Sequence, residues 1–485
     1  MNNHKGNNAL KEGNEFLFEH NCLVAADVDK TLVTQEDKED EMYKFKMLIC
    51  PELMKLAEKG INLAFITGNS MNELASRLVK WILEEINVHS CYNVLSKLHF
   101  FSNSAGVYFY LNPDYILSNI DLKKESKAAI LEKMEKEIFI SDNGILMINP
   151  KFINTEYLER TRIRQHDVMN IREILEKIKT EYNGMFKNNR KRYETNYNIY
   201  GSDEPIPAGI AKEYCYIVKD GYDAAKLEER KVKYLEKGLE RDCIVQFTIK
   251  PVLSFRYAKD RFVKKLFNND LRTLIIDRVN EELKVKGLTN YLAKAGGRSS
   301  IDITPKRVNK KYALEFIIDH LNVQGSDEQP GSNTIYFGDE VIVGGGNDYE
   351  VTKIEGITVF AVNKDRQFVA LRSSVILPSG VNDGPEATYI ILSKLNQIVM
   401  EYNEHGSEHY PVELLKRQIY IDGIRKRIHE EAFVDQLSTQ SLNVLYTITK
   451  LLAINDKHIN SWINTNHKSI DDHLITTGLE DPGDE

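Results

Sequence analysis

The chain has 485 residues, which is too long for one hydrophobic core and indicates two or three domains. Hydrophobic residues make up 42% and charged residues 28% of the chain, and no stretch approaches the roughly 18 apolar residues of a membrane-spanning helix. The net charge of -8 argues against general affinity for nucleic acid, and five scattered cysteines without a CxxC pair suggest neither a disulfide framework nor a zinc knuckle.

The N-terminal residues 1–15 are polar and rich in asparagine. They lack the apolar segment of a secretory signal, so we expect the protein to stay in the cytoplasm. We expect it to associate with neither membranes nor nucleic acid. A homo-oligomer remains possible, since composition does not determine the oligomeric state.

The first predicted strand covers residues 22–26 (CLVAA), a short apolar run typical of a buried parallel strand. It ends abruptly in two acids, Asp27 and Asp29. A second apolar run covers residues 61–66 and ends at Thr67. The sequence therefore predicts two strands that each end in polar residues.

Further elements alternate between helices and strands. Ser70 and Glu73 form a capping box, in which an N-cap serine is followed three residues later by glutamate, and this predicts a helix over 72–83. We also expect strands over 99–103, 334–337, 357–362 and 374–377, and helices over 47–59, 310–321 and 387–402. Alternation of this kind is typical of an α/β fold, in which helices cover both faces of a parallel sheet.

The pattern changes between residues 111 and 288, where charged helical segments are mixed with isolated strands. We predict helices over 123–137, 170–182, 222–237 and 270–286 and a strand over 244–249. This indicates an inserted α+β domain. The predicted organisation is a core in two parts (16–110 and 289–385), the inserted domain (111–288) and a C-terminal helical extension with an acidic tail (386–485).

Asp27 and Asp29 are two residues apart, a spacing that puts both side chains on one side of an extended backbone. In parallel sheets, ligands bind beyond the carboxyl ends of the strands, where this pair falls. Two neighbouring carboxylates repel unless a cation or a shared proton relieves them. The pair alone predicts a metal or acid–base site no better than it predicts a solvated turn.

Three other segments carry complementary groups. Thr67 offers a hydroxyl beside the flexible Gly68 and Asn69, at the start of a capped helix, which suits a phosphate oxygen. Lys310 follows a potential N-cap, Asn309, and offers an ammonium. Phosphoryl transfer requires a nucleophile, a proton donor, oxygen ligands for a metal and a fixed cation. Further oxygen ligands follow the strand at 334–337, namely Asp339, Asn347 and Asp348.

These segments resemble, in order, the four motifs of the haloacid dehalogenase (HAD) superfamily: Asp27-Val28-Asp29-Lys30-Thr31, Thr67-Gly68-Asn69, Lys310, and Gly338-Asp339 with Asn347-Asp348. Residues 297–304 resemble the C2-capped branch, which contains Cof-type sugar phosphatases, sucrose-phosphate phosphatases and phosphomannomutases. The resemblance covers residues 20–105 and 290–380. It implies a HAD Rossmann-like core with an inserted α+β cap of the C2 type.

The resemblance also implies a role for each matching residue. Asp27 would attack phosphorus, and Asp29 would protonate the leaving oxygen and then activate water. Phosphoryl oxygens would be held by Thr67, Gly68, Asn69 and Lys310. Mg2+ would be bound by Asp27, the backbone carbonyl of Asp29, Asp339 and Asp348, with Asn347 in the metal shell or near the substrate.

The sequence departs from the family pattern at Lys30, where glycine is usual, and we expect this side chain to point outward. We predict a magnesium-dependent phosphatase that acts on a small phosphorylated metabolite, with a sugar phosphate as the best single expectation. Three alternatives stay open. They are a phosphohexomutase, a nucleotide-directed phosphatase, and an inactive HAD scaffold that binds partners through its C-terminal helices.

Overall fold

The structure is a computed structural model. It describes residues 22–33, 45–142, 144–188, 225–251, 261–296, 300–323, 330–341, 347–362, 375–376 and 384–405. The predicted acidic tail and the C-terminal helices beyond residue 405 lie outside these ranges. Within them, no helix is both long and apolar enough to cross a membrane.

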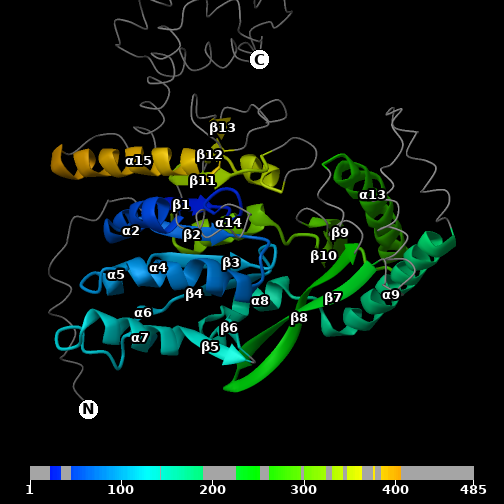
Figure 1. Ribbon diagram of the computed structural model, residues 1–485, viewed down its shortest axis with the longest axis horizontal. Coiled ribbons are helices and arrows are strands. Elements are labelled where there is room, and N and C mark those ends of the chain that lie inside the picture. Colours follow the sequence, from blue (N-terminus) through cyan, green and yellow to red (C-terminus); the bar gives the residue numbers. More distant parts are fainter. Residues whose placement is uncertain are drawn as a thin grey trace, which may run out of the picture.

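A seven-stranded sheet forms the centre of the core, in the order β13-β12-β11-β1-β2-β3-β4 (Figure 1). Its strands are β1 (Leu23–Ala26), β2 (Asn62–Ile66), β3 (Leu98–Ser102), β4 (Val107–Tyr110), β11 (Thr334–Gly338), β12 (Thr358–Ala361) and β13 (Val375–Ile376). Neighbouring strands are parallel, except that β4 runs antiparallel to β3. This confirms the predicted α/β class. Because β1 pairs with both β2 and β11, the residues that follow these three strands meet at one edge of the sheet.

Helices cover both faces of this sheet. Val24 of β1 belongs to a cluster that includes residues of α2 (Cys50–Glu58), α4 (Lys80–Glu85), α7 (Lys127–Ile138) and α15 (Pro385–His405). Leu23 and Ala25 point to the other face and pack with α8 (Thr155–Thr161) and α14 (Lys310–His320). Burial on both faces explains why β1 is continuously apolar instead of alternating.

The remaining core helices are short. They are α3 (Met71–Leu74), α5 (Cys91–Leu95) and α6 (Pro113–Ile116), with π-helical turns at Phe45–Ile49 and Ala75–Val79 and 3-10 turns at Pro150–Phe152 and Tyr349–Lys353. The predicted capping box at Ser70 and Glu73 is present and opens α3. A small hairpin, β5 (Phe139–Asp142) and β6 (Ile145–Ile148), follows α7. Ile130, Met134 and Ile138 of α7 join the core cluster, so the first part of the predicted insertion packs on the core.

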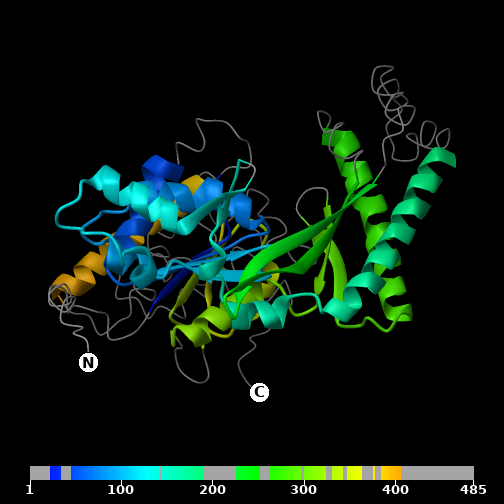
Figure 2. The same cartoon turned by 90° about the horizontal axis from the view of Figure 1, so that it is seen from below.

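A second, antiparallel sheet forms the layer that we call the cap, with strand order β7-β8-β10-β9. Its strands are β7 (Ala225–Glu236), β8 (Leu239–Pro251), β9 (Tyr291–Gly296) and β10 (Ser300–Pro305). The long helices α9 (Gln165–Asn188) and α13 (Arg261–Val285) pack on its apolar face, away from the core (Figure 2). The cap sheet extends to Pro305, so the domain boundary that we predicted at residue 288 falls before two of its strands.

The predicted helix over 222–237 is wrong in its described part, because Ala225–Glu236 form strand β7. Residues 222–224 lie outside the described residues. Charged residues at helical spacing favoured a helix, but Val232 and Tyr234 alternate into a buried face while β7 pairs along its length with β8. Lys237 and Gly238 join the strands with φ of 52° and 78°. Two positive φ values in a two-residue loop are typical of a tight hairpin turn, and the Lys-Gly pair was the signal for it.

Candidate active site

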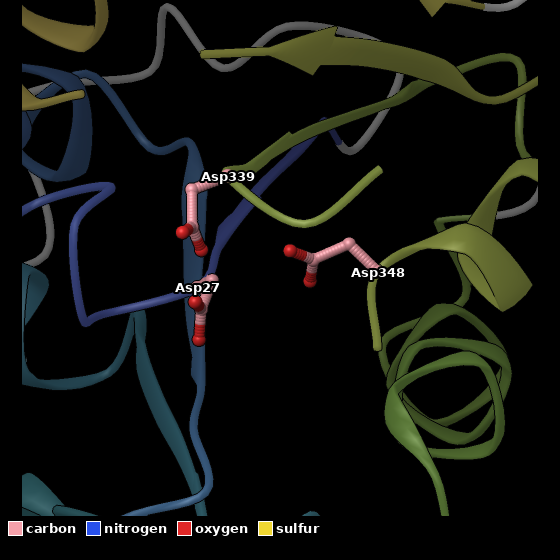
Figure 3. Close-up of side chains that lie close together, drawn as sticks. All are labelled: Asp27, Asp339 and Asp348. Atoms are coloured by element: carbon pink, nitrogen blue, oxygen red, sulfur yellow. The ribbon is translucent and has the colours of Figure 1, made fainter. Parts of the chain in front are cut away.

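Three buried aspartates meet at the carboxyl edge of the core sheet. Asp27 follows β1 and Asp339 follows β11, and the two strands pair so that Ala26 lies opposite Phe337. Asp348 approaches from the loop before the 3-10 turn at Tyr349–Lys353, and its carboxylate points towards the other two (Figure 3). One oxygen from each residue lies within 4.8 Å of the others. The structure therefore brings together three side chains that the sequence analysis assigned to the metal.

Lys310 holds two of these aspartates. Its Nζ lies 2.9 Å from Oδ1 of Asp27 and 2.7 Å from Oδ1 of Asp348, and all three side chains are buried. Asn309 caps α14 as predicted, because its side chain accepts a hydrogen bond from the backbone N–H of Tyr312. Burial alone would lower the pKa of Lys310, but the two carboxylates raise it above its ordinary value. The lysine is therefore a fixed positive charge.

Asp348 is positioned by neighbours that the sequence analysis missed. The Tyr336 hydroxyl donates a hydrogen bond to Oδ1 of Asp348, and the Glu340 backbone N–H donates to Oδ2 at 2.9 Å. A Cβ on Gly338 would lie 2.7 Å from Cγ of Asp348, so this carboxylate requires glycine at position 338. The signal for Tyr336 was its position two residues before Gly338, on the same side of β11.

The buried carboxylates of the site are suited to bind a cation. Burial raises the pKa of Asp27 well above its ordinary value, although Lys310 opposes the rise. Burial and the nearby Asp348 likewise raise the pKa of Asp339 to about 6. A divalent cation among the carboxylates would oppose both rises. Since every donor in the cluster is a carboxylate oxygen, the residues fit Mg2+, which prefers oxygen ligands.

Lys30 points into the site, so the expectation that it points outward is wrong. Its Nζ lies 3.1 Å from Oδ2 of Asp339 and 3.6 Å from Oε1 of Glu340. Its side chain is 35% exposed. Lys30 has a φ of 60°, the left-handed conformation that glycine adopts most easily. A lysine therefore occupies a backbone conformation that glycine would adopt without steric conflict.

Asp29 lies beside the cluster. Its Oδ1 is 3.5 Å from a guanidinium nitrogen of Arg77 and is buried without a hydrogen-bond partner among the described residues. Burial raises the pKa of Asp29, while Arg77 and the Asn69 side chain oppose the rise. A carboxyl group with a raised pKa is suited to donate a proton. The predicted role of Asp29 in proton transfer stays a prediction.

The loop after β2 carries the predicted phosphate-binding residues. Thr67 is buried, and its Oγ1 accepts a hydrogen bond from the Asn69 backbone N–H at 3.1 Å. This loop is tied to the next one, since the N–H groups of Asn103 and Ser104 donate to the carbonyls of Asn69 and Thr67 at 2.7 and 3.1 Å. Gly68 and Asn347 are exposed. The roles of Thr67, Gly68, Asn69 and Asn347 stay predictions.

The loop after β3 is held in an unusual conformation. Asn103, Ser104 and Ala105 have φ values of 53°, 56° and 70°. Each left-handed residue of this kind costs on the order of 1 kcal/mol. The Tyr157 hydroxyl donates a 2.7 Å hydrogen bond to the Ala105 carbonyl and helps to hold the turn. The strained turn thus fixes the neighbouring loop of Thr67 and Asn69.

The cap turns a polar sheet face towards the core. Asp302 of β10 pairs with Thr248 on one side and with Lys294 on the other. The Thr248 hydroxyl donates to Oδ1 of Asp302 at 3.0 Å, and Gln246 Nε2 donates to Oγ1 of Thr248 at 3.1 Å. Lys294 donates to the Val308 carbonyl at 2.9 Å, two residues before Lys310. This row of polar groups, Gln246, Thr248, Asp302 and Lys294, is what we call the cap row.

The sequence matches a family model described as haloacid dehalogenase-like hydrolase over residues 124–384, more than half of the chain. Lys310, Asp339 and Asp348 lie in the matched segment, whereas Asp27 and Thr67 precede it. No curated protein matches the chain.

Several solved structures resemble this one at low identity. The IMP-bound, N-terminally truncated IMP-nucleotidase of Plasmodium falciparum has 15% identity and a TM-score of 0.39, over 78% of this chain and 68% of that chain. Sucrose-phosphatase of Synechocystis in complex with sucrose and phosphate has 12% identity and a TM-score of 0.38, over 77% of this chain and 97% of that chain. A haloacid dehalogenase-like hydrolase of Bacteroides thetaiotaomicron has 10% identity and a TM-score of 0.37, over 77% of this chain and 99% of that chain. On the strength of the family match, the chain belongs to the haloacid dehalogenase-like hydrolases.

Proposed function

We propose that the protein is a magnesium-dependent phosphatase that hydrolyses a small phosphorylated metabolite through an aspartyl-phosphate on Asp27. The observation that carries this proposal is the cluster of Asp27, Asp339 and Asp348, whose oxygens lie within 4.8 Å of one another with Lys310 bound to two of them. Membership of a hydrolase family supports the same chemistry.

The metal would be held by the carboxylates of Asp27, Asp339 and Asp348 and by the backbone carbonyl of Asp29, with Asn347 in the shell or near the substrate. When bound, the ion supplies the positive charge that lets a phosphate dianion approach a carboxylate. Lys310 supplies a second, permanent charge to the phosphoryl oxygens. The Thr67 hydroxyl and the loop of Gly68 and Asn69 would hold the remaining oxygens.

The reaction would proceed in two steps. An oxygen of Asp27 attacks phosphorus, the bond from phosphorus to the ester oxygen breaks, and Asp29 gives its proton to the leaving oxygen. Asp29 then takes a proton from water, whose oxygen attacks phosphorus and breaks the bond to Asp27. Inorganic phosphate leaves and both aspartates return to their initial states.

The cap row supports a hydroxyl-rich leaving group, such as a sugar. Asp302 and Thr248 are buried, and Oε1 of Gln246 is buried without a hydrogen-bond partner among the described residues. A buried acceptor of this kind is costly to leave unpaired, so a movement of the cap row that exposed it to a substrate hydroxyl would be favoured by the new hydrogen bond. The contact between Lys294 and Val308 places this row near Lys310. We therefore propose a sugar phosphate as the substrate class.

The proposal is tested by a panel of phosphate esters with Mg2+ at neutral pH, including hexose phosphates, nucleoside monophosphates and phosphoglycolate. We expect phosphate release from hexose phosphates by the wild type and by Asp277→Asn, a control on the exposed surface of α13, but not by Asp27→Asn. Undiminished release by Asp27→Asn would contradict the proposed nucleophile. Interconversion of hexose phosphates without free phosphate would indicate a mutase, and preference for nucleoside monophosphates would overturn the sugar assignment.

A further inference from the structure

We propose that Lys30 is a tethered cation that balances Asp339 in the metal-free protein and competes with the divalent ion for this carboxylate. The inference rests on the metal site of the proposed function. It concerns a residue to which the catalytic scheme above gives no task. The evidence is the ion pair of Lys30 with Asp339 at 3.1 Å, together with the second contact to Glu340 at 3.6 Å.

The two lysines of the site differ in how freely they can leave. Lys310 lies between Asp27 and Asp348 with a side chain only 5% exposed, so its ammonium is fixed. The Lys30 side chain is 35% exposed and contacts the outer carboxylate of the cluster. A long lysine side chain at such an edge can move its ammonium into water. Of the two lysines, Lys30 is therefore the one whose ammonium can move away from its carboxylate.

The backbone gives an independent reason to assign a task to this side chain. Lys30 has a φ of 60°, and the turn is fixed because its N–H donates to the Val33 carbonyl at 2.5 Å. Glycine would adopt this conformation without the steric conflict of a Cβ. A lysine here carries a conformational cost, and its ion pair with Asp339 helps to offset that cost.

Competition follows from charge. A divalent ion bound to Asp339 would stand close to the Lys30 ammonium and be repelled by it, or would have to displace it from the carboxylate. Removing the ammonium should therefore tighten metal binding. The same change should destabilise the metal-free protein, because Asp339 and Glu340 would lose a shared counter-charge beside Asp27 and Asp348.

The test is calorimetric titration of the full-length protein with Mg2+ in the absence of substrate. We expect Lys30→Met and Lys30→Gly to bind Mg2+ about tenfold more tightly than the wild type, since one unit charge near the ion is removed. Melting temperatures in EDTA should be lower for Lys30→Met than for the wild type, and excess Mg2+ should abolish the difference. Lys30→Gly removes the steric cost of the positive φ. If Lys30→Met does not fold, the Mg2+ affinity of the glycine variant is the test.

Two further variants serve as controls. Lys30→Arg keeps the charge and should bind Mg2+ within about twofold of the wild type. Lys353→Met removes a lysine that pairs with Glu350 outside the cluster and should have no effect on Mg2+ affinity. Unchanged or weaker binding by both Lys30→Met and Lys30→Gly would overturn the inference while leaving the phosphatase proposal intact. Absence of Mg2+ binding to every protein, wild type included, would overturn the metal site and this inference together.

Discussion

The ammonium of Lys310 lies 2.9 Å from Oδ1 of Asp27, so the first residue of α14 is bound to the residue that follows β1. The same ammonium reaches Asp348 at 2.7 Å. One buried charge therefore fixes the relative positions of three segments that are distant in the sequence. This arrangement makes the site sensitive to the loss of any one member.

Replacing Lys310 with methionine should destabilise the metal-free protein by about 3–5 kcal/mol, because two buried carboxylates lose their counter-charge. Mg2+ should restore part of the loss, since it binds only the folded cluster. Urea denaturation with and without Mg2+ measures both effects. Lys311→Met, which removes the next lysine and its partly exposed pair with Glu315, is the matched control. Equal losses in the two variants would contradict the account.

Tyr336→Phe should weaken Mg2+ binding about tenfold, because the hydroxyl that orients Asp348 is lost while the ring keeps its packing. The measurement is a Mg2+ titration followed by calorimetry. Tyr108→Phe removes another buried hydroxyl, which contacts His99 away from the cluster, and should leave the affinity unchanged. If the two variants bind Mg2+ equally well, Tyr336 does not orient the metal ligand.

Gly296→Ala should destabilise the protein by about 1–3 kcal/mol through overpacking, because the added Cβ would lie 2.1 Å from Oδ2 of Asp302. In an Asp302→Ala background the cost should largely vanish, since the clashing carboxylate is absent. Denaturation of the two single variants and the double variant gives the coupling energy. Strict additivity would mean that Asp302 does not occupy the space above Gly296.

His99 should make the protein less stable in acid. It is 3% exposed with its Nδ1 3.0 Å from the Tyr108 hydroxyl, and burial lowers its pKa to about 3, with His320 and Lys97 adding to the effect. The unfolded chain therefore takes up this proton first, and stability falls as pH drops from about 6.5 towards 3.

At pH 5 this histidine alone should lower the free energy of unfolding by about 2 kcal/mol relative to pH 8. His99→Phe removes the group and should flatten the dependence of the unfolding free energy on pH by that amount, whatever its effect at neutral pH. Denaturant titrations at pH 5 and pH 8 measure the change in the free energy of unfolding for the wild type and for His99→Phe. The same change in both proteins would show that His99 is not held neutral in the folded protein.

The core could be predicted from sequence because its signals are local. Apolar runs that end in Asp27, Thr67 and Asp339 mark parallel strands whose carboxyl ends meet, whatever their order in the sheet. The order itself depends on contacts between distant segments, such as the pairing of Leu23 with both Thr334 and Asn62. No local pattern encodes it.

The cap and the site's neighbours were harder to predict. Strand β7 carries helix-like charges, and its partner β8 decides its conformation. The direction of Lys30 follows from a positive φ and from Asp339, which lies far along the chain. Tyr336 looks like an ordinary strand residue until the fold places Asp348 beside its hydroxyl. In each case the outcome depends on a contact that the local sequence pattern does not reveal.

The most direct test of the central claim is to locate the phosphoryl group on the enzyme during turnover. The full-length protein would be quenched while hydrolysing its best substrate with Mg2+, then treated with borohydride, which reduces an acyl phosphate and converts the aspartate to homoserine. We predict homoserine at position 27, dependent on substrate, in peptides analysed by mass spectrometry. Homoserine at another aspartate would contradict the assignment of Asp27 as the nucleophile, as would its absence from position 27 in samples quenched within the first turnover of an active enzyme.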